Sequence, residues 1–263
     1  MAKGNDNRIL NCIPSTFTEK DWTFDDALAS GALQENPEKI PETVDLRDDW
    51  WKVGDQGSTG SCVGWATVDS VIRWHLVKAG LISKEAKLSI RFIWMAAKET
   101  DEYISAPTTF IEIAGTSLKS ALDIARKYGN VLDKVLPFEM GTLYQGRTET
   151  FYSLASKLKI QSYHNLGIDA NNWRKWLANN GPILTRLDVD ATWDKANAAN
   201  SVLAEYQSNT ARGGHAVAIV GYKKDCFIVR NSWGETNWGD RGFAYALDGY
   251  AVKAFTEAYG ISV

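Results

Sequence analysis

The sequence predicts an α+β fold, and three observations point to it. Helical patterns dominate the first half of the chain, and short strands rich in β-branched residues dominate the last third. The 263 residues suffice for one large domain or for two lobes that share a cleft. Hydrophobic residues make up 44% and charged residues 23%, as in folded globular proteins. We therefore expect a mainly helical lobe followed by a β-rich lobe.

Three helices are expected in the first half of the chain and a fourth beyond it. The longest begins at Cys62, directly after a tract rich in glycine and serine, keeps an apolar spacing of about 3.6 residues and ends at Gly80. The other three are expected at 88–98, 117–128 and 171–179. The first 39 residues are polar and mixed, and only 25–33 could form two helical turns.

The last third of the chain is expected to form short strands separated by turns. Their apolar runs lie at 183–189, 215–222, 226–230 and 242–247. Ahead of the helices, the segment 40–47 is expected to be extended, because Pro41 disfavours a helical conformation in the residue before it.

Composition and charge exclude several classes of function. The net charge is −3 and the isoelectric point about 5.7, so there is no basic excess to attract nucleic acid or an anionic membrane. No apolar run approaches the roughly 20 residues of a membrane-spanning helix. The N-terminal residues also lack the apolar stretch of a secretory signal. We therefore expect neither a nucleic-acid nor a membrane partner.

The cysteines are few, and their spacing points to reduced thiols. Cys12, Cys62 and Cys226 include no CxxC pair, which argues against a disulfide framework and against a zinc site. We therefore expect no metal and no cofactor. Reduced thiols without a secretory signal favour a cytoplasmic protein, and they leave open secretion by a route that needs no such signal.

Cys62 is the first candidate for a catalytic group. It lies where the glycine-rich turn meets the long helix, and the positive end of a helix dipole favours the thiolate, which is the nucleophilic form. A cysteine at such a position, taken alone, is more often a small core residue. The residues that could act with it decide between the two interpretations.

Three further polar residues could complete a site around this thiol. His215 opens an apolar strand and Asn231 follows the next strand, so adjacent strands would let the amide fix the imidazole tautomer. Gln56 lies six residues before Cys62, and a turn between them could pair its NH2 with the Cys62 backbone N–H as an oxyanion hole. Taken singly, each has an ordinary alternative: a hydrogen-bonded structural histidine, a turn asparagine and a solvated loop glutamine.

The motifs around these residues resemble those of the papain-like cysteine peptidases. The active-site turn of that family resembles QGSTGSC at 56–62, and its histidine strand resembles GHAVAIVGY at 214–222. Its Asn-Ser-Trp-Gly run resembles NSWG at 231–234, with WG at 238–239 and GF at 242–243. The likeness extends over about 40–263. It implies a papain-like two-lobe fold, with a helical lobe, a β-barrel-like lobe and the active-site cleft between them.

The resemblance implies a role for each candidate. Cys62 is the nucleophile, and His215 pairs with it as imidazolium and later protonates the leaving amine. Asn231 orients the histidine, and Gln56 forms the oxyanion hole with the Cys62 N–H. The reaction is acyl transfer through a thioester that water hydrolyses. The polypeptide substrate would contact Gly115, Thr116, Leu118, Gly214, Ala216 and Trp233. The small, uncharged wall at 213–214 favours a bulky apolar residue two positions before the scissile bond.

The sequence departs from the family pattern at points that remove no catalytic group. Thr59 stands where secreted relatives carry a disulfide cysteine, and Val63 replaces the tryptophan that usually follows the nucleophile. The run between Asn231 and Trp238 is one residue longer than the common pattern. These differences resemble a bacterial or cytosolic branch without the usual disulfides.

The resemblance also divides the chain into three parts. An N-terminal propeptide-like segment occupies 1–39, the helical lobe with the nucleophile 40–145, and the β-rich lobe with the histidine and asparagine 146–263. The first part carries apolar residues that a solvated tail would not need, so we expect it to pack on the enzyme. Two interpretations are open: it covers the cleft near Cys62 and inhibits the enzyme, or it only braces the two lobes.

Three functions are compatible with these observations. The first is a cysteine endopeptidase that hydrolyses peptide bonds, which is our prediction. The second is another acyl transfer at the same site, as in an amidase, deamidase or transpeptidase. The third is a binding module with a papain-like shell, which usually lacks the nucleophile, the histidine or the oxyanion donor. All four candidate groups are present here, which disfavours the third.

Overall fold

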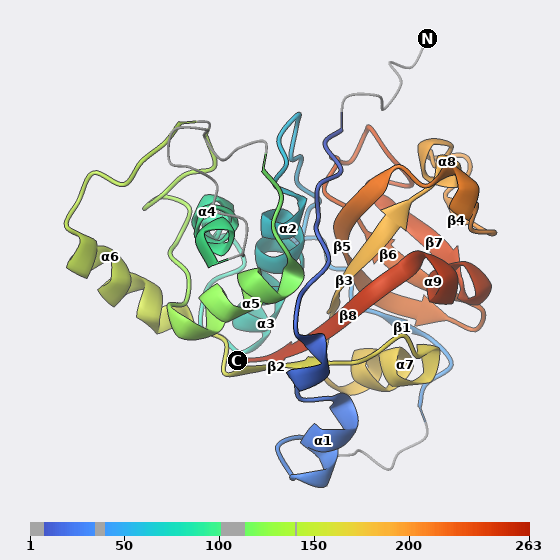
Figure 1. Ribbon diagram of the computed structural model, residues 1–263, viewed down its shortest axis with the longest axis horizontal. Helices are drawn as coiled ribbons and strands as arrows, with labels where there is room; N and C mark the ends of the chain where they lie inside the picture. The colour runs from blue at the N-terminus through green and yellow to red at the C-terminus, as the bar shows by residue number, and fades with distance from the viewer. Residues whose placement is uncertain (1–7, 35–39, 101–113, 140) are drawn as a thin grey trace.

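The helices within residues 62–155 gather on one side of the molecule and the sheet on the other, and the N-terminal segment passes between them (Figure 1). This arrangement comes from a computed structural model that describes residues 8–34, 40–100, 114–139 and 141–263. One hydrophobic core lies under the helices and includes Cys62, and a second lies against the strands and includes Trp233. Within the described residues, no helix is long and apolar enough to cross a membrane.

The long first helix is composite. It begins as α2 (Cys62–Gly64), continues as a π-helix (Trp65–Ile72) and ends as α3 (Arg73–Lys78), where the sequence predicted one α-helix. Every residue from Ala66 to Ile72 is buried, so contacts on all sides, rather than apolar spacing along one face, set the local winding. The start of this run at Cys62 agrees with the prediction.

The other helices of this half are α4 (Ile90–Thr100), α5 (Leu118–Lys127) and α6 (Thr148–Ala155). The sequence predicted α4 and α5 to within about two residues. The hydroxyl of Ser117 accepts the N–H of Ser120 and caps α5. Helix α6 was not predicted, because it is short and buries only Phe151 and Ala155.

Eight strands of the described part of the chain form one sheet. They are β1 (Val44–Asp45), β2 (Ser162–Asn165), β3 (Ile183–Val189), β4 (Val202–Leu203), β5 (Gly213–Lys223), β6 (Cys226–Arg230), β7 (Phe243–Leu247) and β8 (Phe255–Ser262). Their order is β2-β8-β3-β5-β6-β7-β4, and β1 pairs with β5 off this path. The sheet is open rather than closed like a barrel, because β4 is only two residues long and pairs with β7 alone among the described strands.

Three helices cover the sheet, α7 (Ala170–Asn179), α8 (Ala191–Asp194) and α9 (Asp248–Ala254) (Figure 1). The sequence predicted α7 and four of the strands, β3, β5, β6 and β7. It did not predict α9 or β8, although β8 lies inside the sheet between β2 and β3. The β8 sequence FTEAYGIS mixes threonine, glutamate and glycine with apolar residues, so it lacks a clear strand pattern.

A buried ion cluster joins the helical side to the sheet. Arg230, the last residue of β6, donates to the carboxylate of Asp69 at 2.8 Å and to the hydroxyl of Ser70 at 2.6 Å, both in the π-helix. Its guanidinium lies 4.8 Å from the ring centre of Trp51. Because these groups come from both sides of the molecule, the cluster fixes how the two sides meet.

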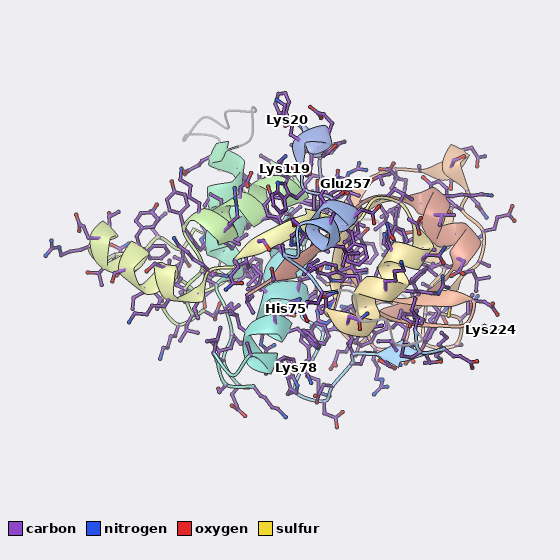
Figure 2. All side chains as sticks on the ribbon, turned by 90° about the horizontal axis from the view of Figure 1, so that it is seen from below. Lys20, His75, Lys78, Lys119, Lys224 and Glu257 are labelled. Carbon is purple, nitrogen blue, oxygen red and sulfur yellow. The ribbon has the colours of Figure 1, made fainter. Side chains whose placement is uncertain are left out.

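The N-terminal segment has two parts, which we call the plug (residues 8–13) and the anchor (residues 15–34). The anchor contains α1 (Phe24–Ala29), whose Phe24 packs in the core of the sheet side. Ser15 links the anchor to both sides, because its N–H donates to Glu257 at 2.9 Å and its hydroxyl accepts the N–H of Lys119 at 3.2 Å. Figure 2 labels these two partners, Lys119 and Glu257.

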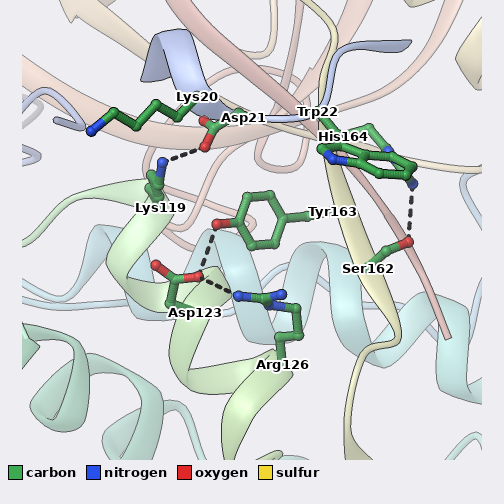
Figure 3. A pocket seen from close by; sticks show the side chains of 9 residues that line it. All are labelled: Lys20, Asp21, Trp22, Lys119, Asp123, Arg126, Ser162, Tyr163 and His164. Atoms are coloured by element: carbon green, nitrogen blue, oxygen red, sulfur yellow. Dashed lines mark hydrogen bonds and ion pairs between the residues drawn. The ribbon is translucent and has the colours of Figure 1, made fainter. Parts of the chain in front are cut away.

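Asp21 is the most buried charged group of the anchor. Its carboxylate accepts hydrogen bonds from the ammonium of Lys119 and, at 3.0 Å, from the hydroxyl of Tyr259. These contacts form one wall of a pocket of about 490 Å³ between the anchor, α5 and β2 (Figure 3). The anchor is therefore integrated into the body of the protein rather than lying loosely on it.

Candidate active site

Cys62 begins α2 and is completely buried. Backbone N–H groups of Ala216, Val63, Cys62 itself and Asn11 point at its sulfur, and each favours the thiolate. Burial has a larger effect than these N–H groups, so the pKa of the Cys62 thiol is raised above its ordinary value. In this conformation the sulfur is therefore held as a thiol, although its N–H surroundings are suited to an anion.

His215 and Asn231 meet as the sequence predicted. They lie on the neighbouring strands β5 and β6 or directly after them, and the His215 Nε2 is 2.8 Å from the Asn231 Oδ1. The other ring nitrogen, Nδ1, makes no hydrogen bond within the described residues. The N–H of Ala216, the next residue along β5, points at the Cys62 sulfur, so the start of β5, which carries His215, lies against the thiol.

Burial lowers the pKa of His215 to about 4, although the hydrogen bond that its Nε2 donates to the Asn231 Oδ1 raises the pKa. The positive charge of Arg8 lowers the pKa further. The imidazole is therefore neutral at ordinary pH in this conformation. A neutral imidazole and a protonated thiol do not yet form the ion pair that the resemblance implies.

Gln56 is buried, and its side-chain amide is fixed from both ends. Ser232 donates its hydroxyl to the Gln56 Oε1 at 2.8 Å, and the Gln56 Nε2 donates to the carbonyl of Thr59 at 3.0 Å. The Gln56 backbone N–H also donates to the Ser232 carbonyl at 2.8 Å. The Thr59 carbonyl can only accept a hydrogen bond, so this contact assigns the orientation of the amide, with its NH2 group towards the turn that leads to Cys62.

Aromatic rings shield the imidazole of His215 from solvent. Trp233 lies over it with ring centres 5.0 Å apart, and Trp193 meets it edge-on at 6.1 Å. Trp193 in turn stacks on Trp238 at 4.5 Å. The sequence motif pointed to Trp233 and Trp238. It gave no sign of Trp193, which comes from α8, a helix that follows a different strand.

Comparison with known proteins shows which family this site belongs to. The sequence model of the papain family of cysteine proteases matches residues 40–260. The chain belongs to the papain family of cysteine proteases. It is a cysteine peptidase, and the motifs that carried the resemblance lie within the matched region.

Individual proteins of the papain family share only a minority of their residues with this chain. Cathepsin B-like CP3 of Giardia intestinalis is 29% identical over 245 residues, which cover 88% of this chain and 75% of that protein. Among solved structures, Xylellain, a cysteine protease from Xylella fastidiosa, has a TM-score of 0.79 at 22% identity and covers 100% of this chain and 98% of its own. ProCathepsin B S9 from Trypanosoma congolense has a TM-score of 0.70 at 14% identity, covering 98% of this chain and 87% of its own.

In this papain-family chain the plug lies directly over the candidate site. The backbone N–H of Cys12 donates to the carbonyl of Gly214 at 3.0 Å, and that of Ile13 donates to the carbonyl of Thr116 at 3.2 Å. Asn11 lies between Cys62 and the glycines, because a methyl group on Gly115 would overlap its carbonyl oxygen. These contacts explain why Cys62 and His215 are fully buried.

The plug also touches most of the residues that the sequence proposed for substrate binding. Gly115, Thr116 and Gly214 contact its backbone, and the Trp233 carbonyl accepts a bond from Arg8 at 3.4 Å. Leu118 and Ala216 are buried in the same core cluster as Cys12 and Cys62. Four of the six, Gly115, Thr116, Gly214 and Trp233, therefore border the space that the plug fills.

The wall beside Gly214 carries a charge that the sequence did not reveal. Arg186 of β3 lies opposite Ala216, and its Nε donates to the carbonyl of Cys12 at 3.0 Å. Its two NH2 groups bind Thr256 and Asp188. The wall is small at Gly214, as expected, but a guanidinium rather than an uncharged surface lies behind it. Only strand register brings Arg186 there.

Proposed function

We propose that this cysteine peptidase is an endopeptidase in which Cys62, His215, Asn231 and Gln56 perform the chemistry. The observation that carries the proposal is the 2.8 Å contact between His215 and Asn231, which fixes the imidazole and leaves its Nδ1 without a hydrogen bond among the described residues. The N–H groups around the Cys62 sulfur and the fixed Gln56 amide support the same assignment.

The reaction follows from these positions. His215 takes the proton of Cys62, and the thiolate attacks the peptide carbonyl carbon to give a tetrahedral oxyanion. The Cys62 N–H and the Gln56 NH2 stabilise that oxyanion. His215 then gives its proton to the leaving amine, and a thioester remains. Water, deprotonated by His215, hydrolyses the thioester and regenerates the thiol.

We also propose that the plug inhibits the enzyme. Its backbone bonds to Gly214 and Thr116 occupy the groups that would bind an extended substrate. With the plug in place, burial raises the pKa of Cys62 and lowers that of His215, so the site is both covered and uncharged. ProCathepsin B S9, a similar structure, is a proenzyme by its name.

The direction of the plug explains how it can lie in the site without being cut. It runs from Arg8 beside Trp233 to Ile13 beside Thr116. The resemblance places the acyl side of the substrate at Thr116, so a substrate would run the opposite way. Reversed polarity moves each carbonyl away from the position that the nucleophile attacks.

The experiment that tests the endopeptidase proposal uses the chain without residues 1–14, so that the plug is absent and the anchor remains. It is incubated with denatured casein and, separately, with a peptide epoxide that alkylates thiols. Fragmentation of casein together with labelling at Cys62 is expected. Labelling without fragmentation would overturn the endopeptidase assignment in favour of an amidase, deamidase or transpeptidase. Cys62→Ala is the control and should show neither result.

We further propose that the protein works in a reducing compartment such as the cytoplasm. None of its three cysteines, all of which lie in the described regions, forms a disulfide. A thiol must also remain reduced to act as a nucleophile. Fractionation of the source cells tests this, and recovery of the active enzyme only outside them would contradict it.

A further inference from the structure

The guanidinium of Arg8 in the plug occupies a receptor built by the body of the enzyme. Its Nη1 donates to the Asp55 Oδ1 at 2.7 Å and to the Gly57 carbonyl at 2.7 Å. Its Nη2 donates to the Trp233 carbonyl at 3.4 Å, and the group lies 5.6 Å from the Trp233 ring centre. A carboxylate, two carbonyls and an aromatic face therefore converge on one cation.

The receptor does not depend on Arg8 for its shape. The Gly57 N–H donates to the Asp55 Oδ1 at 2.9 Å, and the Asn237 amide donates to the Oδ2 at 3.1 Å. Asp55 also forms an antiparallel bridge with Trp233. Burial alone would raise the pKa of Asp55, but the bonds from Arg8, Gly57 and Asn237 hold it below its ordinary value. The carboxylate is therefore ionised and oriented by the body of the protein.

The receptor lies on the leaving-group side of the site. Trp233 covers the imidazole of His215, which protonates the leaving amine in the proposed mechanism. Gly57 follows Gln56, the proposed oxyanion donor. The groups assigned to the acyl side, Thr116 and Gly214, bind the other end of the plug. A substrate side chain that reaches Asp55 must therefore belong to a residue after the scissile bond.

We propose that Asp55 is a specificity-determining residue that selects an arginine among the first three residues after the scissile bond. This inference rests on the proposed function of the site. When the plug leaves, the receptor loses its cation, and a substrate arginine restores the same bonds. Arginine is favoured over lysine, because a planar guanidinium can donate to the carboxylate and to both carbonyls at once.

The exposure of the pair sets the size of the effect. The side chain of Arg8 is 14% exposed and that of Asp55 is 41% exposed, so solvent weakens the ion pair. The two carbonyl bonds and the aromatic contact add to it. We expect kcat/KM to rise about 10-fold when an arginine occupies the right position, in place of an uncharged residue of similar length.

The test compares peptides that differ at one position. A parent peptide that the full-length enzyme cuts at a single mapped bond is resynthesised with arginine, lysine or norleucine at each of the three positions after that bond. The ratio of kcat/KM for arginine over norleucine is then measured for the wild type, Asp55→Asn and Asp225→Asn. For a given variant, the same fraction of enzyme molecules has the plug displaced whichever peptide is added. The ratio of the two kcat/KM values therefore does not depend on how tightly the plug binds.

One position should give a ratio of about 10 in the wild type, with lysine between arginine and norleucine. Asp55→Asn should reduce that ratio to near 1, whereas Asp225→Asn, which removes an exposed charge in the turn between β5 and β6, should preserve it. A wild-type ratio near 1 at all three positions, or a preference that survives in Asp55→Asn, overturns this inference alone. Failure of both the wild type and the chain without residues 1–14 to cut any peptide would instead overturn the proposed function.

Discussion

The hydroxyl of Ser232 and the carbonyl of Thr59 hold the Gln56 amide, and the Thr59 carbonyl determines which end faces the reaction, because a carbonyl can only accept a hydrogen bond. The serine hydroxyl binds the Gln56 Oε1, and the Thr59 carbonyl accepts one hydrogen of the Nε2. The second hydrogen of the NH2 group is then available for an oxyanion. This arrangement makes the oxyanion hole rigid before substrate binds, which is what gives such donors their effect on the transition state.

Gln56→Ala should therefore lower kcat by roughly 100-fold with little change in KM, because the donor acts on charge that develops only in the transition state. Gln56→Glu should be worse, since a carboxylate repels the oxyanion. Steady-state kinetics on the chain without residues 1–14 measures both. An effect on KM alone would place Gln56 in substrate binding instead.

At the scale of elements, the N-terminal segment combines the two roles that the sequence left open. The plug covers the cleft through backbone bonds, whereas the anchor contributes Phe24 to the core and Asp21 to a buried cluster with Lys119 and Tyr259. Different residues of the N-terminal segment therefore cover the cleft and brace the two sides of the molecule. The boundary lies near Pro14, which is exposed.

Two deletions should separate these roles. Removing residues 1–14 should raise the rate at which an epoxide labels Cys62 and leave the melting temperature nearly unchanged. Removing residues 1–39 should also lower the melting temperature, because it takes away the buried Phe24 and Asp21. Labelling and thermal unfolding measure the two effects. Equal labelling rates in the full chain and in the shorter deletion would contradict inhibition by the plug.

At the scale of the whole molecule, Arg230 ties the sheet to the helices. Its side chain is 1% exposed and burial lowers its pKa, but the charge of Asp69 counteracts this. Arg230→Met should reduce the free energy of unfolding by about 3 kcal/mol, because it leaves Asp69 without one of its two cations. Arg212→Met, which breaks an exposed pair with Asp194, should cost less than about 1 kcal/mol.

Urea unfolding of the full chain measures both variants. An Arg230→Met protein as stable as Arg212→Met would show that the buried cluster contributes little to holding the two sides together.

Buried histidines should make the fold less stable in acid. Burial lowers the pKa of His75 from 6.5 to about 4, so between these values the unfolded chain binds a proton that the folded chain does not. The stability from neutral His75 is complete above its unfolded pKa and falls as the pH drops towards the folded one. Between about pH 7.5 and about pH 5, this residue should account for about 2 kcal/mol.

Urea unfolding at those two pH values, for the wild type and for His75→Gln, checks this expectation. His215, whose pKa burial also lowers to about 4, should leave a similar pH dependence in the variant. An unchanged pH dependence in His75→Gln would show that His75 is not the group responsible.

Local patterns in the sequence were enough to predict the α-then-β order, helices α4, α5 and α7, four of the eight described strands, and the four candidate catalytic residues. These features are local: the apolar spacing of a helix, the glycine-rich turn before Cys62 and the motif around Asn231 are written in neighbouring residues. The same locality explains the failures. Helix α6 and strand β8 have weak patterns of their own and are stabilised by what they pack against.

Only the tertiary structure decided what lies in and around the cleft. Arg186 reaches the wall beside Gly214 through the pairing of β3 with β5, and Trp193 reaches His215 from a separate helix. The plug meets Gly214 from about 200 residues away in the chain, and Arg8 reaches Asp55 through the same path. Such contacts depend on strand register and on how segments cross, and no spacing within one stretch of sequence encodes them.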